Sequence, residues 1–563
     1  MKNKLLASIL TACMLLTMLP TAAFAAETEA ESGTEQTATA TEQSDPVTED
    51  AGDQTEGTAD GTDAGDAASG QTAENSVAKV GDKYYATLAE AIDVADSKTV
   101  TLIANVTENV TIPAGTTVTL DLNGKTLTSA ANDQSTIVVN GNLTVEDRTA
   151  GQPTVSNEYE VSYTSGSIKS TDIPVKVQNG GSFTLNGGKI ESEKESGLFV
   201  IGDKTGTDAI NSSATINGGY INSQEYGIGV VGKGASLTVD GGVIETRDNA
   251  VIGGNGTYEE GDRQGDTTIT IKDGTLIGHI TSQGYVACGI YHPQRGTLNI
   301  SGGTIYADGG VGVLMRGGTA NITGGKIITT GNQEVVGKVG DSKVVVGCHG
   351  IQVDGISRYY DYDNAKVEIS GNVNIQSQSE AVKHTDTSAP AAQKIFISKG
   401  TFSSDVNDYC ATGYTATKNE SGQWVVSPKE GMEADTSVSG NTASAEVGGT
   451  FSGNEDLGQD NVGASNGTLS IDATVTEGDT ATITKTEVSI GNEALTSVSG
   501  ANSVNSVVLK TNVADLTVDK AAWNAITANA DGNSVTLTVE KKEDASSPAD
   551  WTVSAVDSKG ETV

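Results

Sequence analysis

The sequence predicts an all-β chain whose main body is a parallel β-helix of about a dozen three-strand coils. Three observations predict this fold. Short runs of alternating polar and apolar residues recur, most of them end at a corner that contains glycine, and "NISGGTI" (299–305) returns as "NITGGKI" (321–327) after 22 residues. Glycine supplies 69 of the 563 residues, as expected for a chain with many tight corners.

The repeat also explains why the strands must stack. Each strand has only about four or five residues, so it cannot bury an apolar face by itself. When such units stack, every strand pairs with its counterpart about 4.8 Å away in the next coil. The inward residues then form one continuous core. Further copies of the strand and corner begin at 182, 214, 236, 268, 366 and 394.

The N-terminal residues predict export and a spacer. Residues 1–25 are expected to be a signal peptide, because Lys2 and Lys4 precede an apolar run that ends in the small-x-small pattern Ala-Phe-Ala. Residues 26–75 hold 14 acidic residues and no Lys or Arg. They have almost nothing to bury and are expected to form a disordered acidic linker.

The β-helix domain is expected to span 76–427, with a cap at each end. The ends of such a stack expose unpaired strand edges and core. A helix over 86–98 is the predicted N-terminal cap, and Thr87 with Glu90 fits a capping box at its start. Residues 400–426 are expected to close the other end.

Two further segments follow. Residues 428–465 are rich in Gly, Ser and Asn and predict a linker or a loosely ordered strand pair. Residues 466–563 predict a small β-rich domain that carries one helix at 519–532. This helix is expected to bury three residues on one face, Ala522, Trp523 and Ile526.

Charge and cysteine content limit the possible partners. Lys and Arg total 34 against 73 Asp and Glu, for a net charge of -39 at pH 7. Such a chain repels nucleic acid, so nucleic-acid binding is not expected, and no membrane insertion is expected after the signal is cleaved. Three cysteines remain beyond the signal peptide, an odd number that argues against disulfides. Cys288 and Cys348 should lie two coils apart, too far to be bridged.

Two segments carry a resemblance to a known family. "KVGDKYYATLAEAIDVADSKTVTLIANVTENVTIPAGTTVTLDLNGKTLT" resembles the entry segment of pectate-lyase-like, right-handed parallel β-helix surface proteins of Gram-positive gut bacteria. "ISKGTFSSDVNDYCATGYTATKNESGQWVV" resembles their closing segment. The resemblance covers about 77–427 and implies a secreted or cell-wall-associated, adhesin-like protein. The sequence shows no LPxTG anchor motif, which leaves the means of attachment open.

One pair of carboxylates is a catalytic candidate if the chain is an enzyme. The outward position after the glycine corner holds Glu191 and Glu245, two coils and so about 9.6 Å apart along the axis. That separation is near the upper limit for an inverting glycosidase. The alternative is that both are solvated carboxylates on a sheet surface. No metal site or cofactor is expected, because the four histidines are scattered, at His279, His292, His349 and His384.

The ligand-binding candidates lie in "SRYYDYD" (357–363), in a chain with only 4% aromatic residues. They are Arg358, Tyr359, Tyr360 and Tyr362. Tyrosine rings can stack on sugar faces and donate hydrogen bonds at the same time. The alternative is that these rings only cover the side of the solenoid.

These observations predict a secreted or cell-surface β-helix protein, without catalysis, that presents a long surface to an extracellular glycan or to a host or bacterial surface protein. The first alternative is a polysaccharide lyase or glycoside hydrolase of the same fold. A second is a structural spacer of the cell envelope. Converging carboxylates beside a basic residue would favour the enzyme, and flat outward columns of Thr, Asn and Ser would count against it.

Overall fold

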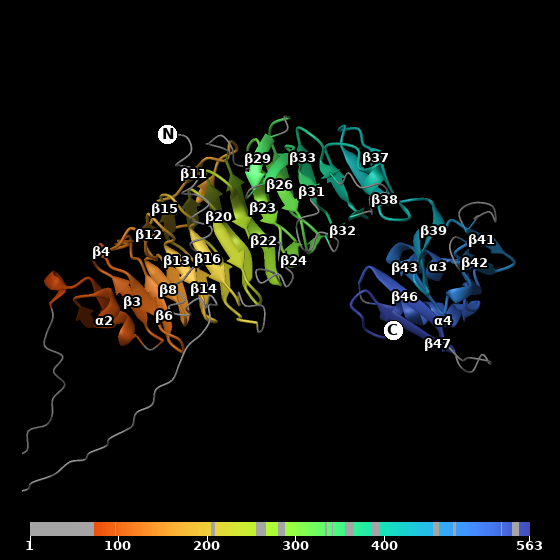
Figure 1. The fold of residues 1–563 in the computed structure, drawn as a ribbon, viewed down its shortest axis with the longest axis horizontal. Helices are drawn as coiled ribbons and strands as arrows, with labels where there is room; N and C mark the ends of the chain where they lie inside the picture. Colours follow the sequence, from red (N-terminus) through yellow and green to blue (C-terminus); the bar gives the residue numbers. More distant parts are fainter. Residues whose placement is uncertain are drawn as a thin grey trace, which may run out of the picture. The chain divides into compact units, whose positions relative to one another are not determined.

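Three columns of short parallel strands form the main body of the molecule (Figure 1). Within each column, a strand pairs with the strands of the preceding and following coils, as in a parallel β-helix. The predicted fold class is therefore confirmed. This structure is a computed structural model, and it describes residues 72–563 other than 96, 204–208, 255–265, 280–287, 333–334, 340–341, 355–364, 386–393, 454–460, 477–479, 531 and 543–550.

The strands follow one another from column to column around each coil. The first column consists of β3 (Thr99–Leu102), β6 (Thr117–Asp121), β9 (Asn142–Glu146), β14 (Ser182–Leu185), β17 (Ser213–Ile216), the first halves of β20 (Ser236–Thr246) and β22 (Thr267–Gly278), β24 (Gly296–Ile300), β27 (Thr319–Ile322), β32 (Lys366–Ile369) and β35 (Ile395–Ile397). The second consists of β4 (Val106–Thr107), β7 (Thr126–Thr128), β12 (Ser167–Ser170), β15 (Lys189–Ser192), β18 (Tyr220–Ser223), the second halves of β20 and β22, β25 (Thr304–Ala307), β28 (Lys326–Thr329), β33 (Asn374–Ser377) and β36 (Gly400–Phe402). The third consists of β5 (Val110–Ile112), β8 (Ile137–Val139), β13 (Val175–Val177), β16 (Leu198–Ile201), β19 (Ile228–Val231), β21 (Ala250–Gly253), β23 (Cys288–His292), β26 (Val311–Met315), β31 (Ile351–Val353) and β34 (Val382–His384).

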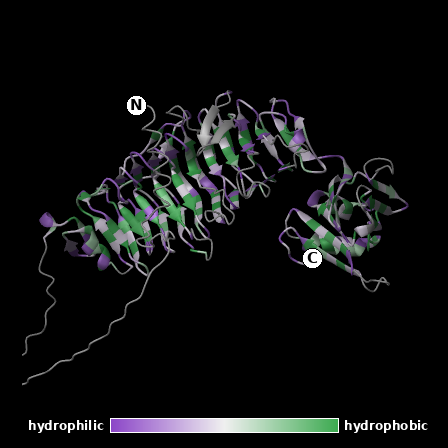
Figure 2. Cartoon of the chain, in the orientation of Figure 1, coloured by the Kyte–Doolittle hydropathy of each residue, from purple (hydrophilic) through white to green (hydrophobic). Residues whose placement is uncertain are grey.

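Inward residues of the three columns form the core of the solenoid. Ile300 lies beside Ile322, and Ile305 beside Ile327, as the 22-residue repeat predicts. All four side chains are at most 1% exposed. Figure 2 shows hydrophobic residues along the strands and hydrophilic residues mainly in the connecting turns. Burial of one such isoleucine contributes about 1.5–3 kcal/mol, so each coil adds to the stability of its neighbours.

The repeated glycine pair forms the corner between the first and second columns. At Gly302, a Cβ atom would overlap the carbonyl oxygen of Lys272 in the preceding coil. At Gly303, φ is +76°, a left-handed conformation that strains residues with a Cβ atom. The same two constraints recur at Gly324 and Gly325. The first glycine thus permits close contact between coils, and the second turns the chain.

Replacement of the first glycine should therefore destabilise the solenoid. We expect Gly302→Ala to lower the free energy of unfolding by about 1–3 kcal/mol, because the added methyl forces two coils apart. Urea unfolding of the full chain measures the change. Gly151→Ala is the matched control, since nothing lies within 4 Å of its added Cβ and its φ is not left-handed. Equal effects of the two substitutions would contradict this account of the corner.

Both ends of the stack are capped. At the N-terminal end lie the 3₁₀ turn η1 (Ala73–Asn75), strands β1 (Ala78–Val80) and β2 (Lys83–Tyr85), and helix α2 (Leu88–Asp93). Helix α2 begins with the predicted capping box between Thr87 and Glu90, although it ends before the predicted boundary. At the other end, after the 3₁₀ turn η3 (Asn407–Tyr409), strand β38 (Trp424–Pro428) pairs antiparallel with β36 and with β37 (Tyr414–Lys418).

Two described insertions form hairpins. The first, between β9 and β12, contains β10 (Thr154–Val155) and β11 (Val161–Ser162). The second, between β28 and β31, contains β29 (Val335–Val339) and β30 (Ser342–Val346).

The C-terminal residues form a five-stranded and a four-stranded sheet. The five-stranded sheet has the order β39 (Gly431–Ser439), β40 (Thr442–Thr450), β43 (Lys485–Gly491), β46 (Ser534–Lys541) and β47 (Trp551–Asp557). The four-stranded sheet has the order β41 (Val462–Ser465), β42 (Thr468–Asp472), β44 (Ser506–Lys510) and β45 (Leu516–Asp519). The remaining elements are η4 (Thr480–Thr482), α3 (Asn492–Gly500) and α4 (Lys520–Asn529).

For residues 428–465 the sequence predicts a linker or a loosely ordered strand pair. The structure has the antiparallel pair β39 and β40 there, and β40 also pairs with β43 of the small domain. Alternate residues of this hairpin are buried, but they are mostly alanines, which weakens the strand signal. The domain also holds two helices rather than one, because α3 buries Ala494, Leu495 and Val498. In α4, Trp523 is buried as predicted, whereas Ile526 is only half-buried and Ala522 is exposed.

Candidate functional site

The outward residues of the second column contain the predicted carboxylate pair. The register runs from Glu191 through Asn222 to Glu245, then to Ile277, Tyr306 and Ile328. This is the order that the repeat predicts. Glu191 and Glu245 are therefore separated by one strand, which corresponds to about 9.6 Å along the axis. The two carboxylates lie on the same face, but each has partners of its own.

Two lysines hold the Glu191 carboxylate. Lys169 Nζ lies 2.7 Å and Lys189 Nζ 2.5 Å from its two oxygens. Burial alone would raise the pKa of Glu191, but the hydrogen bonds and charges of the two lysines outweigh burial and lower it. Lys189 also lies over the ring of Tyr220, 5.1 Å from its centroid. Glu191 is therefore an ionised member of an ion-pair cluster.

A histidine and a tyrosine hold the Glu245 carboxylate. His279 Nε2 lies 3.1 Å from Glu245 Oε1, and the Tyr220 hydroxyl donates to Glu245 Oε2. The amide of Asn222 donates in turn to the Tyr220 oxygen, at 2.9 Å. Burial would raise the pKa of Glu245, but these hydrogen bonds, with the charges of His279 and Arg247, lower it. Asn222, Tyr220, Glu245 and His279 thus form one connected polar chain.

The β10–β11 hairpin lies over this column. Gln152 Oε1 accepts a hydrogen bond from the backbone N–H of Gly219 at 3.1 Å, and the Tyr163 hydroxyl accepts one from Gly188 at 2.9 Å. The ring of Tyr159 stacks on that of Tyr306, with centroids 3.8 Å apart and planes 8° apart. The hairpin packs against three outward residues that are at most 6% exposed, Tyr220, Val243 and Ile277.

Sequence reasoning missed the hairpin and the roles of Tyr220 and His279. The available signal was apolar residues at outward positions, where a solvated face would hold polar ones. Ile277 follows Glu245 in the same outward column, yet its side chain is fully buried. Such a residue indicates that another segment covers the column at that point.

The outer face of the first column is a regular polar surface. One outward position holds threonine in seven successive coils and then asparagine in two, before Glu368 and Phe396. These residues are Thr99, Thr119, Thr144, Thr184, Thr215, Thr238, Thr270, Asn299 and Asn321. The two asparagines are hydrogen-bonded through their side chains at 3.0 Å. Cross-strand threonine pairs stabilise a sheet, so these residues stabilise the solenoid whether or not they also contact a partner.

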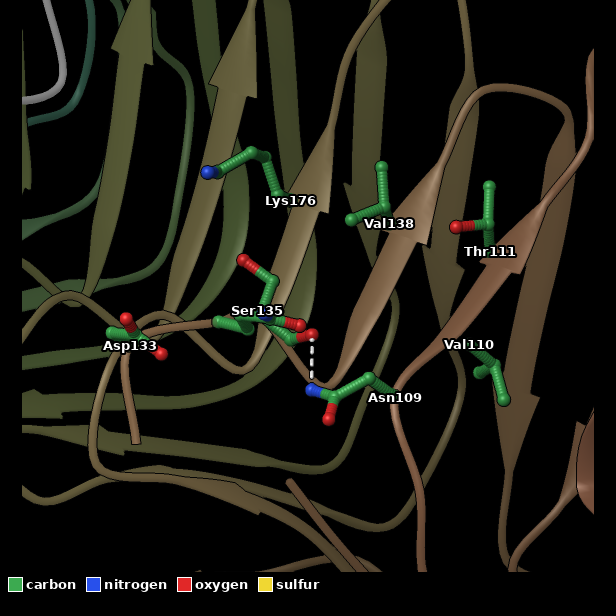
Figure 3. A pocket seen from close by; sticks show the side chains of 8 residues that line it. Asn109, Val110, Thr111, Asp133, Ser135, Val138 and Lys176 are labelled. Carbon is green, nitrogen blue, oxygen red and sulfur yellow. Dashed lines mark hydrogen bonds between the residues drawn. The ribbon is translucent and has the colours of Figure 1, made fainter. Parts of the chain in front are cut away.

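A hollow of about 380 Å³ lies on the third column near the N-terminal end (Figure 3). Its lining combines the polar side chains of Asn109, Ser135 and Lys176 with the apolar side chain of Val138. Figure 3 shows the Asn109 amide directed at the backbone of Ser135, where it donates to the carbonyl oxygen at 2.8 Å. The same amide nitrogen lies 2.7 Å from Ser129 Oγ. Asn109 therefore holds the turn in place rather than facing a ligand.

The remaining candidates are placed as follows. Arg358, Tyr359, Tyr360 and Tyr362 lie outside the described residues. His349 is 7% exposed, and its Nδ1 lies 3.4 Å from Ser379 Oγ and 3.8 Å from a carboxylate oxygen of Glu380. Cys288, Cys348 and Cys410 are free thiols, and burial raises the pKa of Cys288 to about 12. Among the described residues, no group of His, Cys, Asp and Glu could hold a metal ion.

The pairing of His279 with Glu245 should depend on pH. Hydrogen bonding to Glu245 raises the pKa of His279, although burial opposes it. The pair therefore stabilises the folded state fully below about pH 6.5, the ordinary pKa of histidine. This stabilisation is lost as the pH rises through the folded-state pKa of His279. A double-mutant cycle with His279→Gln and Glu245→Gln should give a coupling energy below about 1 kcal/mol at pH 6. It should fall to near zero at pH 9. A cycle between His279 and Glu191 is the control and should show no coupling.

No described helix has both the length and the apolar character needed to cross a membrane.

Comparison of the sequence with models of known families, with curated proteins and with solved structures gave no significant match.

Proposed function

We propose that this chain is a secreted or cell-surface β-helix protein that binds an extracellular glycan or surface protein without catalysing a reaction. The sequence resemblance to pectate-lyase-like surface proteins of Gram-positive gut bacteria, and the predicted signal peptide, support this proposal. The row of threonine and asparagine side chains from Thr119 to Asn321 supports it further, because it offers uncharged hydroxyl and amide groups over successive coils.

The state of the two candidate carboxylates is the argument against catalysis by this pair. A glycosidase needs one carboxyl group that keeps its proton near neutral pH, and such a group has a raised pKa. In Glu191 and Glu245 the pKa is lowered instead, by two lysines in one case and by His279 and Tyr220 in the other. Both groups are ionised and engaged, so neither is suited to donate a proton to a leaving group.

Two alternatives remain as proposals of their own. A polysaccharide lyase or glycoside hydrolase is favoured by one observation, the carboxylate, imidazole and phenol of Glu245, His279 and Tyr220 joined under a hairpin. A spacer of the cell envelope is favoured by the regularity of the stacked coils. Such a stack has a fixed length along its axis and needs few long loops.

A glycan array with the full chain from residue 26, run beside a reducing-end assay on every hit, tests the three readings. We expect binding without release of reducing ends. Cleavage that is lost in Glu245→Gln would establish the enzyme and overturn the proposal. Absence of binding to every glycan on the array would overturn the glycan-binding form of the proposal.

The aromatic candidates provide a second test. We expect the double variant Tyr359→Ala/Tyr360→Ala to bind any hit at least about tenfold more weakly, equivalent to about 1.4 kcal/mol. Tyr84→Ala is the matched control, because Tyr84 is an exposed tyrosine near the N-terminal cap. If both variants bind as the unmodified chain does, the ligand surface lies elsewhere on the solenoid.

A further inference from the structure

Carboxylates recur at the corner between the second and third columns. Asp172 follows β12, Glu195 follows β15, Glu225 follows β18 and Asp248 follows β20, so each occupies the same corner of a successive coil. The backbone N–H of Glu225 donates to the carbonyl oxygen of Glu195 at 3.3 Å, which fixes the two residues in register. Adjacent coils are about 4.8 Å apart, a separation at which like charges repel.

The surroundings of the two glutamates contain few compensating groups. The Glu225 carboxylate accepts a hydrogen bond from the Asn249 amide at 3.1 Å, and Asp248 one from Gln224 at 2.5 Å. The turn at Glu195 is held through its backbone N–H, which donates to Ser192 Oγ at 3.0 Å. Within the described part of the chain, neither glutamate forms an ion pair, whereas Glu191, four residues before Glu195, forms two.

Charges on each neighbouring coil act on this corner. The charges of Asp172, in the coil before, and of Glu225, in the coil after, both act on Glu195, and the charge of Asp248 acts on Glu225. Glu193 and Lys194, in the turn of Glu195, and Arg247, next to Asp248, are exposed. The corner therefore gathers carboxylates on consecutive coils, and the cations beside them are solvated.

We infer that the corner formed by Glu195 and Glu225 is a pH-responsive clasp, which holds the coils from β15 to β19 more tightly in mildly acidic than in neutral medium. Burial, with the charges of Glu225 and Asp172, raises the pKa of Glu195 to about 7, and burial raises the pKa of Glu225. A carboxyl group whose folded-state pKa is raised loses stability as the pH rises from its unfolded value towards the folded one. For Glu195 this window runs from pH 4.5 to about pH 7.

Hydrogen exchange of the full chain, followed by mass spectrometry at pH 5.5 and 7.5, tests the inference. After correction for intrinsic exchange, peptides that cover β15, β16, β18 and β19 should be roughly tenfold less protected at pH 7.5, the equivalent of one pKa unit. In Glu195→Gln the change should shrink to about twofold. Glu193→Gln removes the same charge from the same turn at an exposed position, so it should retain the full change.

Two results would overturn the inference. One is a pH-dependent loss of protection that persists in both Glu195→Gln and Glu225→Gln. The other is its disappearance in Glu193→Gln, which would assign the effect to net charge rather than to the corner. Glu225→Gln also keeps the test decisive if Glu195→Gln is poorly folded. His279 and Glu245 are unchanged in every variant, so their own titration contributes equally throughout.

Discussion

Asp354→Ala should lower the free energy of unfolding of the solenoid by about 3–5 kcal/mol, the usual effect of breaking a buried ion pair. Arg316 at the end of β26 is 0% exposed. Its Nε donates to Asp354 Oδ2 at 2.8 Å, and one terminal nitrogen lies 2.6 Å from the same oxygen. The other donates to the Tyr291 hydroxyl at 3.2 Å. Removal of Asp354 leaves a cation that water cannot reach.

Urea unfolding of the full chain measures this loss of stability, and two further variants serve as controls. Asp266→Ala breaks the pair between Arg295 and Asp266, whose side chains are 38% and 39% exposed, and should cost less than about 1 kcal/mol. The double variant Arg316→Met/Asp354→Leu removes both buried charges and should recover most of the stability. If Asp354→Ala costs no more than Asp266→Ala, the pair is not desolvated as described.

Trp523→Ala should lower the free energy of unfolding of the C-terminal domain by about 3–5 kcal/mol, as for other buried aromatic residues. The side chain is 0% exposed and packs in the core that joins the two C-terminal sheets with α3 and α4. Its Nε1 donates to the carbonyl oxygen of Leu495 in α3 at 3.1 Å. The truncation therefore leaves a cavity and removes a buried hydrogen bond at once.

Thermal unfolding followed by far-UV circular dichroism measures the effect of Trp523→Ala. Trp523→Phe keeps most of the buried ring and loses only the hydrogen bond, so it should cost about 1–2 kcal/mol. Trp551→Ala, at the start of the edge strand β47 where the side chain is partly exposed, is the control for loss of any tryptophan. A similar loss in Trp523→Ala and Trp551→Ala would show that α4 does not anchor this domain.

The solenoid could be predicted because its period fixes which residues meet. Once "NISGGTI" and "NITGGKI" are aligned, Ile300 must lie beside Ile322, and the same alignment places Glu191, Asn222 and Glu245 in one outward column. Strand pairing in such a fold links residues about one repeat apart. The repeat therefore contains the information needed for the columns, the core and the glycine corners.

The missed features depend on contacts outside the repeat. Gln152 meets Gly219, which lies 67 residues away, so no local pattern places the β10–β11 hairpin over the second column. No sequence pattern marks Arg316 as buried, because its burial depends on pairing with Asp354, 38 residues further along the chain. The partners of Glu191 and Glu245 decide their ionisation. Lys189 lies on the same strand as Glu191, but Lys169, Tyr220 and His279 come from neighbouring coils.

The glycine corner has a consequence for how such a chain can change. From β14 onward, strands of the first and second columns are joined by only a few residues, and at Gly302 these contact the coil before directly, which leaves no room for an added loop. The β10–β11 hairpin enters the same corner earlier, between β9 and β12, before this run of short corners begins. The β29–β30 hairpin lies between the second and third columns instead. From β14 onward, the molecule thus has one uniformly short corner beside another that accepts inserted sequence, and loops grafted at the second corner would be spaced by the coils.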